Sequence, residues 1–149
     1  MRSALVSTQW LAEHAKDPAL RLADASWFLP AAKRDPKAEY AAAHLPGAVY
    51  FDIDAISDKS NPLPHMLPGA EQFAAAVSAL GLGDAHHIVL YDSNGFFAAA
   101  RAWWMFRHFG HDQVSVLDGG LAKWQAEGRP VDALPVTPQP AVFTARPRP

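Results

Sequence analysis

Apolar and polar positions alternate along the chain in blocks that predict strands and helices in turn. Residues 20–25, 48–53 and 114–117 have a β-prone pattern, and residues 88–91 form an uninterrupted apolar run. Such a run is typical of a strand that is buried on both faces of a parallel sheet. Helical patterns are found at residues 9–15, 36–43, 70–80, 96–109 and 121–127. This alternation predicts an α/β fold, with a mostly parallel sheet between two layers of helices.

Aspartates follow the predicted strands. Asp24, Asp54, Asp92 and Asp118 stand at or just after the four carboxyl ends. In parallel sheets of this kind, ligands bind beyond the carboxyl ends of the strands. The pattern therefore places the candidate chemistry at one edge of the sheet.

A long segment rich in proline, residues 54–69, separates the second predicted strand from the next helix. A segment of this length without a regular pattern is more often functional than idle in a compact domain. It contains Asp54 and His65, and a carboxylate–imidazole pair can polarise a serine hydroxyl supplied from elsewhere. The alternative is that Asp54 caps a turn and His65 is an ordinary loop residue.

The turn after residues 88–91 leads directly into the longest predicted helix. Backbone N–H groups at such a helix N-terminus bind anions and lower the pKa of a thiol placed there. Here the turn begins with Asp92, and a carboxylate repels anions and is a poor nucleophile for sulfur. We expect Asp92 to cap the helix, in a turn with the shape of a catalytic loop but without the reactive atom. Arg101, inside the helix, can contact an anion or form a buried ion pair with a strand-end aspartate.

The same helix carries large aromatic side chains on more than one face, namely Trp103, Trp104, Phe106 and Phe109. A helix that is apolar most of the way round is buried on both sides. Trp and Phe are also favoured at interfaces between proteins. Core packing alone and contact with a second domain are both open explanations.

The composition is that of a single globular domain. The 149 residues are 50% hydrophobic and 19% charged, which excludes a disordered chain. The formal net charge of -2, without a basic cluster, argues against a nucleic-acid partner. No run approaches the roughly 20 apolar residues that cross a bilayer, so no membrane partner is expected. The first residues lack the apolar region of a secretory signal, and we expect a cytoplasmic protein.

The chain contains no cysteine, which excludes a thiol nucleophile, disulfides and thiolate metal sites within it. His108 and His111 have a spacing that can bind zinc, but Gly110 separates them and further ligands are lacking. Gly81 and Gly83 precede a predicted strand, whereas phosphate-binding glycines follow one. We therefore expect no metal and no cofactor.

The last part of the chain differs in character. Residues 132–149 are proline-rich and have no period, which is typical of a linker. The predicted domain therefore covers residues 1–131.

Several short motifs occur in an order that resembles the rhodanese superfamily. The resemblance is to the N-terminal, non-catalytic domain of two-domain thiosulfate and mercaptopyruvate sulfurtransferases, and it runs from Leu5 to about Val131. The motifs are Leu5-Val6-Ser7, Asp24-Ala25-Ser26-Trp27, His44-Leu45-Pro46-Gly47-Ala48, Phe51-Asp52-Ile53-Asp54, His65-Met66-Leu67-Pro68, Arg101-Ala102-Trp103-Trp104-Met105-Phe106-Arg107 and Asp118-Gly119-Gly120-Leu121. The resemblance implies a rhodanese-like fold, with a parallel sheet of about five strands and helices on both faces.

The resemblance also implies a sulfurtransferase. Such an enzyme takes sulfur from mercaptopyruvate or thiosulfate onto a cysteine as a persulfide, and passes it to cyanide, thioredoxin or another thiol. In this family the cysteine lies in the C-terminal domain, which is absent from this chain and is the implied partner. The matching turn of the N-terminal domain carries an aspartate. The implied inactive counterpart of the catalytic loop consists of Asp92, Ser93, Asn94, Gly95, Phe96 and Phe97, together with Arg101.

The mercaptopyruvate branch of the family has an acid and a histidine that match Asp54 and His65. They face the catalytic loop across the domain boundary, where they are proposed to activate a serine. The thiosulfate branch tends to have an apolar residue at the histidine position, so His65 favours mercaptopyruvate as the donor. The alternative function is a non-catalytic rhodanese-like module that binds a protein or a small anion. A generic nucleotide-binding domain is a more distant alternative.

Overall fold

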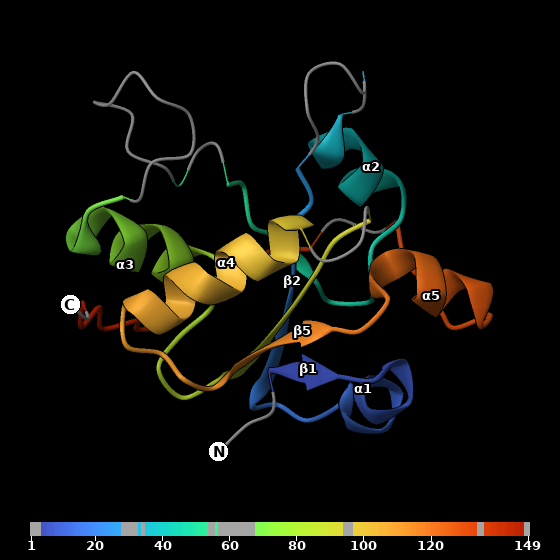
Figure 1. Cartoon of the computed structure of the whole chain (residues 1–149), viewed down its shortest axis with the longest axis horizontal. Helices are drawn as coiled ribbons and strands as arrows, with labels where there is room; N and C mark the ends of the chain where they lie inside the picture. Colours follow the sequence, from blue (N-terminus) through green and yellow to red (C-terminus); the bar gives the residue numbers. More distant parts are fainter. Residues whose placement is uncertain are drawn as a thin grey trace.

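Short strands and helices alternate along the chain, as the sequence predicts (Figure 1). The computed structural model describes residues 4–27, 33, 35–53, 56, 68–93, 97–133 and 136–147. The strands are β1 (Leu5–Val6), β2 (Leu20–Asp24), β3 (Val49–Tyr50), β4 (His87–Tyr91) and β5 (Val114–Leu117). The helices are α1 (Thr8–His14), α2 (Pro36–Ala42), α3 (Ala70–Ala79), α4 (Phe97–His108) and α5 (Gly120–Ala126).

The five strands form one parallel sheet with the order β1-β5-β4-β2-β3. Strand β4 lies in the middle and all five of its residues are buried, as its apolar run predicts. Strands β2 and β4 pair from Leu20 opposite His87 to Asp24 opposite Tyr91. The segments that follow β2 and β4 therefore start side by side, and the predicted α/β fold with a parallel sheet is confirmed.

Two edge strands differ from the prediction. The pattern does not predict β1, because two residues that pair only with β5 are too few to make a periodic signal. The β-prone run at 48–53 contributes only Val49–Tyr50 to the sheet. The remaining apolar residues of this run, Phe51 and Ile53, are buried in the core instead. Edge strands receive hydrogen bonds from one side only, so their ends depend on local packing more than on the β-prone pattern.

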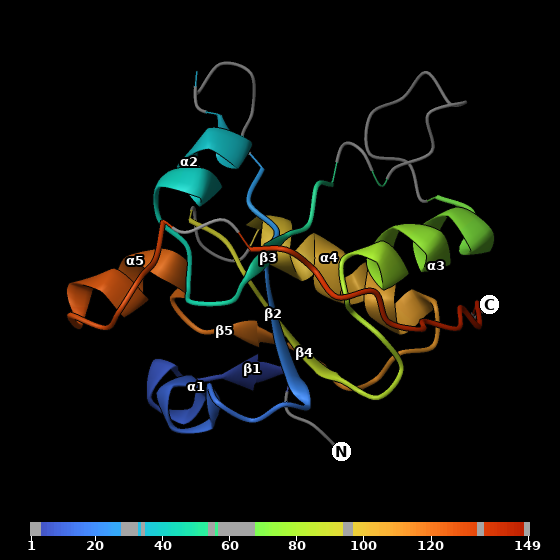
Figure 2. The same ribbon diagram turned by 180° about the vertical axis from the view of Figure 1, so that it is seen from behind.

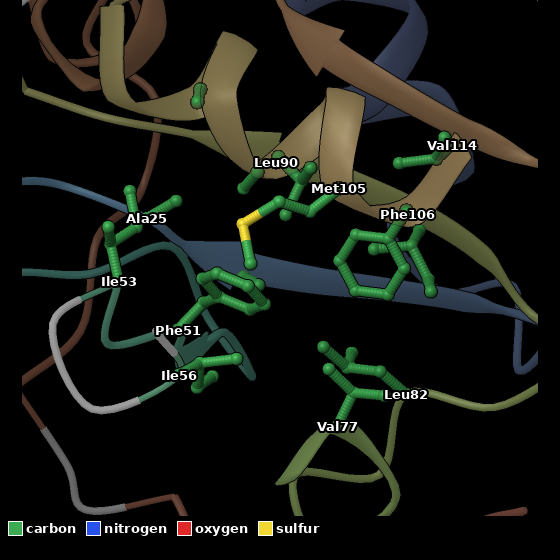
Figure 3. Close-up of a cluster of buried hydrophobic side chains, with 14 of the residues drawn as sticks. Ala25, Phe51, Ile53, Ile56, Val77, Leu82, Leu90, Met105, Phe106 and Val114 are labelled. Carbon is green, nitrogen blue, oxygen red and sulfur yellow. The ribbon is translucent and has the colours of Figure 1, made fainter. Parts of the chain in front are cut away.

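Helices cover both faces of the sheet (Figures 1 and 2). On one face, α3 and α4 bury a cluster that includes Phe73 and Phe106. Figure 3 shows Met105 and Phe106 of α4 beside Phe51 and Leu90 in this cluster. On the other face lies a second cluster, with side chains from α1, α5 and α2: Leu11, Trp124 and Tyr40. Asp24 and Asp92, at the carboxyl ends of β2 and β4, are buried polar residues outside both clusters.

Residues 136–147 contain no helix or strand, yet they pack onto the domain (Figure 2). The Ser78 carbonyl at the end of α3 accepts the N–H of Ala141 at 2.9 Å. Phe143 is buried in the same cluster as α3 and α4. That residues 132–149 connect two domains stays a prediction, and the structure adds that much of this segment is anchored on the present one.

Candidate functional site

Two buried aspartates meet at the carboxyl edge of the sheet. Asp24 ends β2 and Asp92 directly follows β4, and almost no surface of either residue reaches solvent. Because β2 and β4 are neighbours, the prediction that strand-end aspartates gather at one edge is correct for this pair. Asp118 follows β5 at the same edge and is partly exposed.

The Asp24 carboxylate is held by the chain that continues from it. Its Oδ1 atom accepts the backbone N–H of Ser26 at 2.8 Å. The pKa of Asp24 is raised from an ordinary value of 3.8 to about 6. Burial is the largest cause, hydrogen bonds from Ser26 and the charge of His44 act in the opposite direction, and the nearby Asp92 adds to the rise. Asp24 therefore titrates close to neutral pH, because its surroundings disfavour the charged form.

Asp92 is fixed to two helices at once. Its Oδ2 atom accepts the N–H of Ala99, in the first turn of α4, at 2.8 Å. Its carbonyl oxygen accepts the N–H of Leu121, in the first turn of α5, at 2.9 Å. The capping contact expected of Asp92 is thus present. A backbone N–H that an external anion would use is already bonded to the protein's own carboxylate.

Ser26 joins the end of β2 to the turn after β4. Its Oγ atom accepts the N–H of Ser93 at 3.0 Å, and the two hydroxyl oxygens are 3.3 Å apart. The sequence pattern does not single out Ser26 as a site residue. The available signal was its position two residues after Asp24, beyond a strand end. That position becomes informative only when β2 and β4 are known to be neighbours, because their adjacency brings Ser26 next to Ser93.

Part of the predicted site lies outside the described residues. These residues are Asp54, His65, Asn94, Gly95 and Phe96. Phe97 is described only as the first residue of α4. The Asp54–His65 pair therefore stays a prediction.

Arg101 lies on α4 beside a surface tryptophan. Its guanidinium carbon is 5.1 Å from the ring centre of Trp104, and His108 stacks on the same ring at 5.4 Å. Burial lowers the pKa of Arg101. Trp104 is 43% exposed, whereas Phe106 and Phe109 are in the core. Core packing explains the two phenylalanines but not Trp104, and the ion pair predicted for Arg101 stays a prediction.

Neither a metal-binding cluster nor a long apolar helix occurs in the described ranges. In these ranges, no three His, Cys, Asp or Glu side chains lie together in a way that could hold a metal ion. Within the same part of the chain, none of the helices has the length and apolar character of a membrane span.

The chain is similar in sequence and in structure to several known proteins. Residues 7–127 match the Rhodanese-like domain family. The chain is 49% identical to human 3-mercaptopyruvate sulfurtransferase, over 96% of its own length, and 48% identical to bovine thiosulfate sulfurtransferase, over 95%. The crystal structure of the 3-mercaptopyruvate sulfotransferase SseA from Escherichia coli aligns with a TM-score of 0.93 and 43% identity, over 99% of this chain.

These matches cover only part of each relative. The chain spans 50% of the human protein, 50% of the bovine protein and 57% of the SseA chain. It corresponds to the N-terminal half of these two-domain proteins. The activities of the relatives therefore belong to polypeptides about twice as long as this chain.

Proposed function

The chain belongs to the rhodanese family, and from this premise we propose that it is the non-catalytic half of a sulfurtransferase. The complete enzyme moves sulfur from mercaptopyruvate, or from thiosulfate, to a thiol or cyanide through a cysteine persulfide. One observation carries the proposal: the chain has no cysteine, and the turn after β4 presents Asp92, whose carboxylate is bonded to α4. The reactive thiol then belongs to a second rhodanese domain, which is the partner of this one.

The proposed reaction needs a nucleophile that this domain does not supply. A cysteine thiolate of the partner domain attacks the sulfur of mercaptopyruvate, so that an S–S bond forms and the C–S bond breaks. The electron pair leaves on the carbon of pyruvate, which takes up a proton. A thiolate, such as that of thioredoxin, or cyanide then attacks the outer sulfur and releases the cysteine. Asp92 is buried and has carboxylate oxygens in place of a thiol, so it does not accept the transferred sulfur.

The present domain contributes the surroundings of this reaction. Asp54 and His65 are proposed to polarise a serine of the partner's catalytic loop, as a carboxylate–imidazole pair does in other enzymes. This pair favours mercaptopyruvate over thiosulfate as the donor. Of the relatives in the comparison, the human protein is named for mercaptopyruvate and the bovine protein for thiosulfate. The family match therefore supports the reaction type and leaves the choice of donor to the Asp54–His65 pair.

Turnover measurements on two proteins test the proposal. The 149-residue chain is expected to release neither pyruvate from mercaptopyruvate nor thiocyanate from thiosulfate and cyanide. The protein encoded by the complete reading frame is expected to do so through a cysteine of its second domain. Turnover by the chain alone would contradict the assignment of the nucleophile. A complete protein that binds thioredoxin or a small anion without turnover would favour the non-catalytic module.

A histidine substitution in the complete protein tests the choice of donor. We expect His65→Ala to lower turnover of mercaptopyruvate by about 10²-fold or more, the usual size of a general acid–base contribution. Thiosulfate turnover and the melting temperature are expected to change little. The matched control is His14→Ala, because His14 is an exposed residue of α1 on the opposite face of the sheet from α4. Equal losses of stability and turnover would make His65 structural, and equal loss of turnover with both donors would contradict the choice of mercaptopyruvate.

A further inference from the structure

We propose that Ser26 is a positioning residue that sets the geometry of the turn after β4 toward the partner domain. This inference rests on the proposed function, because it assigns a role to Ser26 in the same sulfurtransferase site. Ser26 does not act on sulfur itself. It acts through Ser93, the first residue of the turn after Asp92.

Ser26 is itself immobilised on both sides. Its backbone N–H donates to Oδ1 of Asp24 at 2.8 Å, and the Tyr50 hydroxyl donates to its carbonyl oxygen at 3.5 Å. Its side chain is almost entirely buried. The Oγ atom is therefore a fixed acceptor, and the N–H of Ser93 donates to it at 3.0 Å.

The turn is held from three directions. The Asp92 side chain is bonded to α4 and its carbonyl to α5, as described above. The Asp92 carbonyl and the Ser93 N–H belong to one planar peptide unit. Leu121 holds the carbonyl end of this unit, and Ser26 holds its N–H end from the side of β2. Ser93 is partly exposed, so part of this residue is accessible from outside the domain.

The location of Ser93 makes its position matter for the reaction. It lies at the carboxyl edge of a parallel sheet, where such folds bind ligands. It also belongs to the segment that resembles the catalytic loop. A shift of the Ser93 peptide unit therefore weakens the binding of substrate at this edge, and leaves the thiol chemistry unchanged.

Three variants of the complete protein test this role. Ser26→Ala removes the acceptor for the Ser93 N–H, whereas Ser26→Thr keeps it. Ser115→Ala is the matched control, because Ser115 is also buried and its Oγ atom is 2.9 Å from Nε2 of His87, nearer the amino ends of the strands. For each protein we would measure the melting temperature, the KM and kcat for mercaptopyruvate, and the amide hydrogen exchange of Ser93.

The two alanine variants are expected to lose stability of the same order, since each removes the hydrogen-bonding hydroxyl of a buried serine. Only Ser26→Ala is expected to raise KM, by about 2- to 10-fold, the factor that corresponds to one such bond. We expect kcat to stay within about 2-fold, because the substitution removes binding rather than transition-state stabilisation. Ser93 exchange is expected to accelerate in Ser26→Ala alone, and Ser26→Thr is expected to restore both readouts.

Two results would overturn the role of Ser26. One is an unchanged KM in Ser26→Ala when the wild-type protein turns over, and the other is an equal rise of KM in Ser115→Ala. A wild-type protein without any turnover would contradict the proposed function instead. Exchange in the 149-residue chain then decides alone: faster exchange of Ser93 in Ser26→Ala supports the positioning role, and unchanged exchange overturns it.

Discussion

Gly120 packs so closely against Asp92 that a Cβ atom on Gly120 would lie 2.5 Å from the Asp92 carbonyl oxygen. The same carbonyl accepts the N–H of Leu121 at 2.9 Å. Gly120 also has a φ of +60°, which residues with a side chain rarely adopt. The start of α5 and the turn after β4 are therefore joined at a point where only glycine fits.

This contact predicts a large effect of Gly120→Ala on stability. We expect the free energy of unfolding to fall by about 2–4 kcal/mol, from the positive φ and from the forced shift of the Asp92 carbonyl. The matched control is Gly128→Ala, since Gly128 has a φ of +74° but no other atom within 4 Å of the place where its Cβ would lie. That variant is expected to lose about 1–2 kcal/mol. Urea unfolding of both proteins measures the difference, and equal losses would show that the close approach is unimportant.

Asp92 itself is predicted to stabilise the domain as a helix cap. Asp92→Ala leaves the N–H of Ala99 without its carboxylate acceptor and is expected to lower the free energy of unfolding by about 1–2 kcal/mol. Asp92→Asn keeps an acceptor oxygen and is expected to lose less. Chemical denaturation gives the two values, and hydrogen exchange at Ala99 reports the contact directly. An asparagine variant that is as unstable as the alanine variant would mean that the charge matters more than the hydrogen bond.

The regular pattern of the chain predicts the elements that are long or central. β4 is expected at residues 88–91 and is found at His87–Tyr91, and α3 is expected at residues 70–80 and is found at Ala70–Ala79. The two-residue strand β1 is not predictable in this way, because its pairing with β5 defines it. Periodicity identifies buried faces, whereas the ends of edge strands depend on neighbours that are distant in sequence.

The same limit applies to the site. The gathering of Asp24 and Asp92 follows from the parallel arrangement of strands, and the sequence predicts it. The contact between Ser26 and Ser93 requires that β2 lie next to β4, although β3 comes between them in the chain. The burial of Phe143 could not be predicted from the sequence either, because the proline-rich segment around it has no helical or strand periodicity.

The raised pKa of Asp24 predicts a pH-dependent stability. The folded protein binds the Asp24 proton more tightly than the unfolded chain does, so this group favours folding below the ordinary pKa of 3.8. That contribution is lost as the pH rises through about 6, where the buried carboxyl ionises. Asp24→Asn stays neutral and keeps an oxygen for the N–H of Ser26. We therefore expect the variant to be more stable than the wild type above pH 6, by up to about 3 kcal/mol.

Unfolding experiments across the pH range measure this difference. It is expected to shrink toward zero as the pH falls toward the ordinary pKa of an aspartate, because both proteins are then neutral at position 24. A difference between Asp24→Asn and wild type that does not change with pH would contradict the assignment of the titration to Asp24.

Residues 136–147 are predicted to be part of the folding unit, in spite of their irregular structure. The N–H of Phe143 donates to Oγ of Ser78 at 3.0 Å, and its ring lies among Phe73, Phe106 and His111 at centre distances of 5.4–5.7 Å. Only 5% of Phe143 is exposed, whereas its neighbour Val142 is 75% exposed. The chain therefore contains a buried and an exposed apolar residue side by side, which makes a matched pair of variants.

We expect Phe143→Ala to lower the free energy of unfolding by about 3–5 kcal/mol, because the lost ring leaves a cavity between α3 and α4. Val142→Ala is expected to change it by less than about 0.5 kcal/mol, as is usual at an exposed position. Denaturant titration of the two variants measures both values. A single transition with an unchanged dependence on denaturant in Phe143→Ala would mean that the segment unfolds together with the sheet. Similar, small losses in both variants would mean that residues 136–147 contribute little to the fold, and that the domain is complete without them.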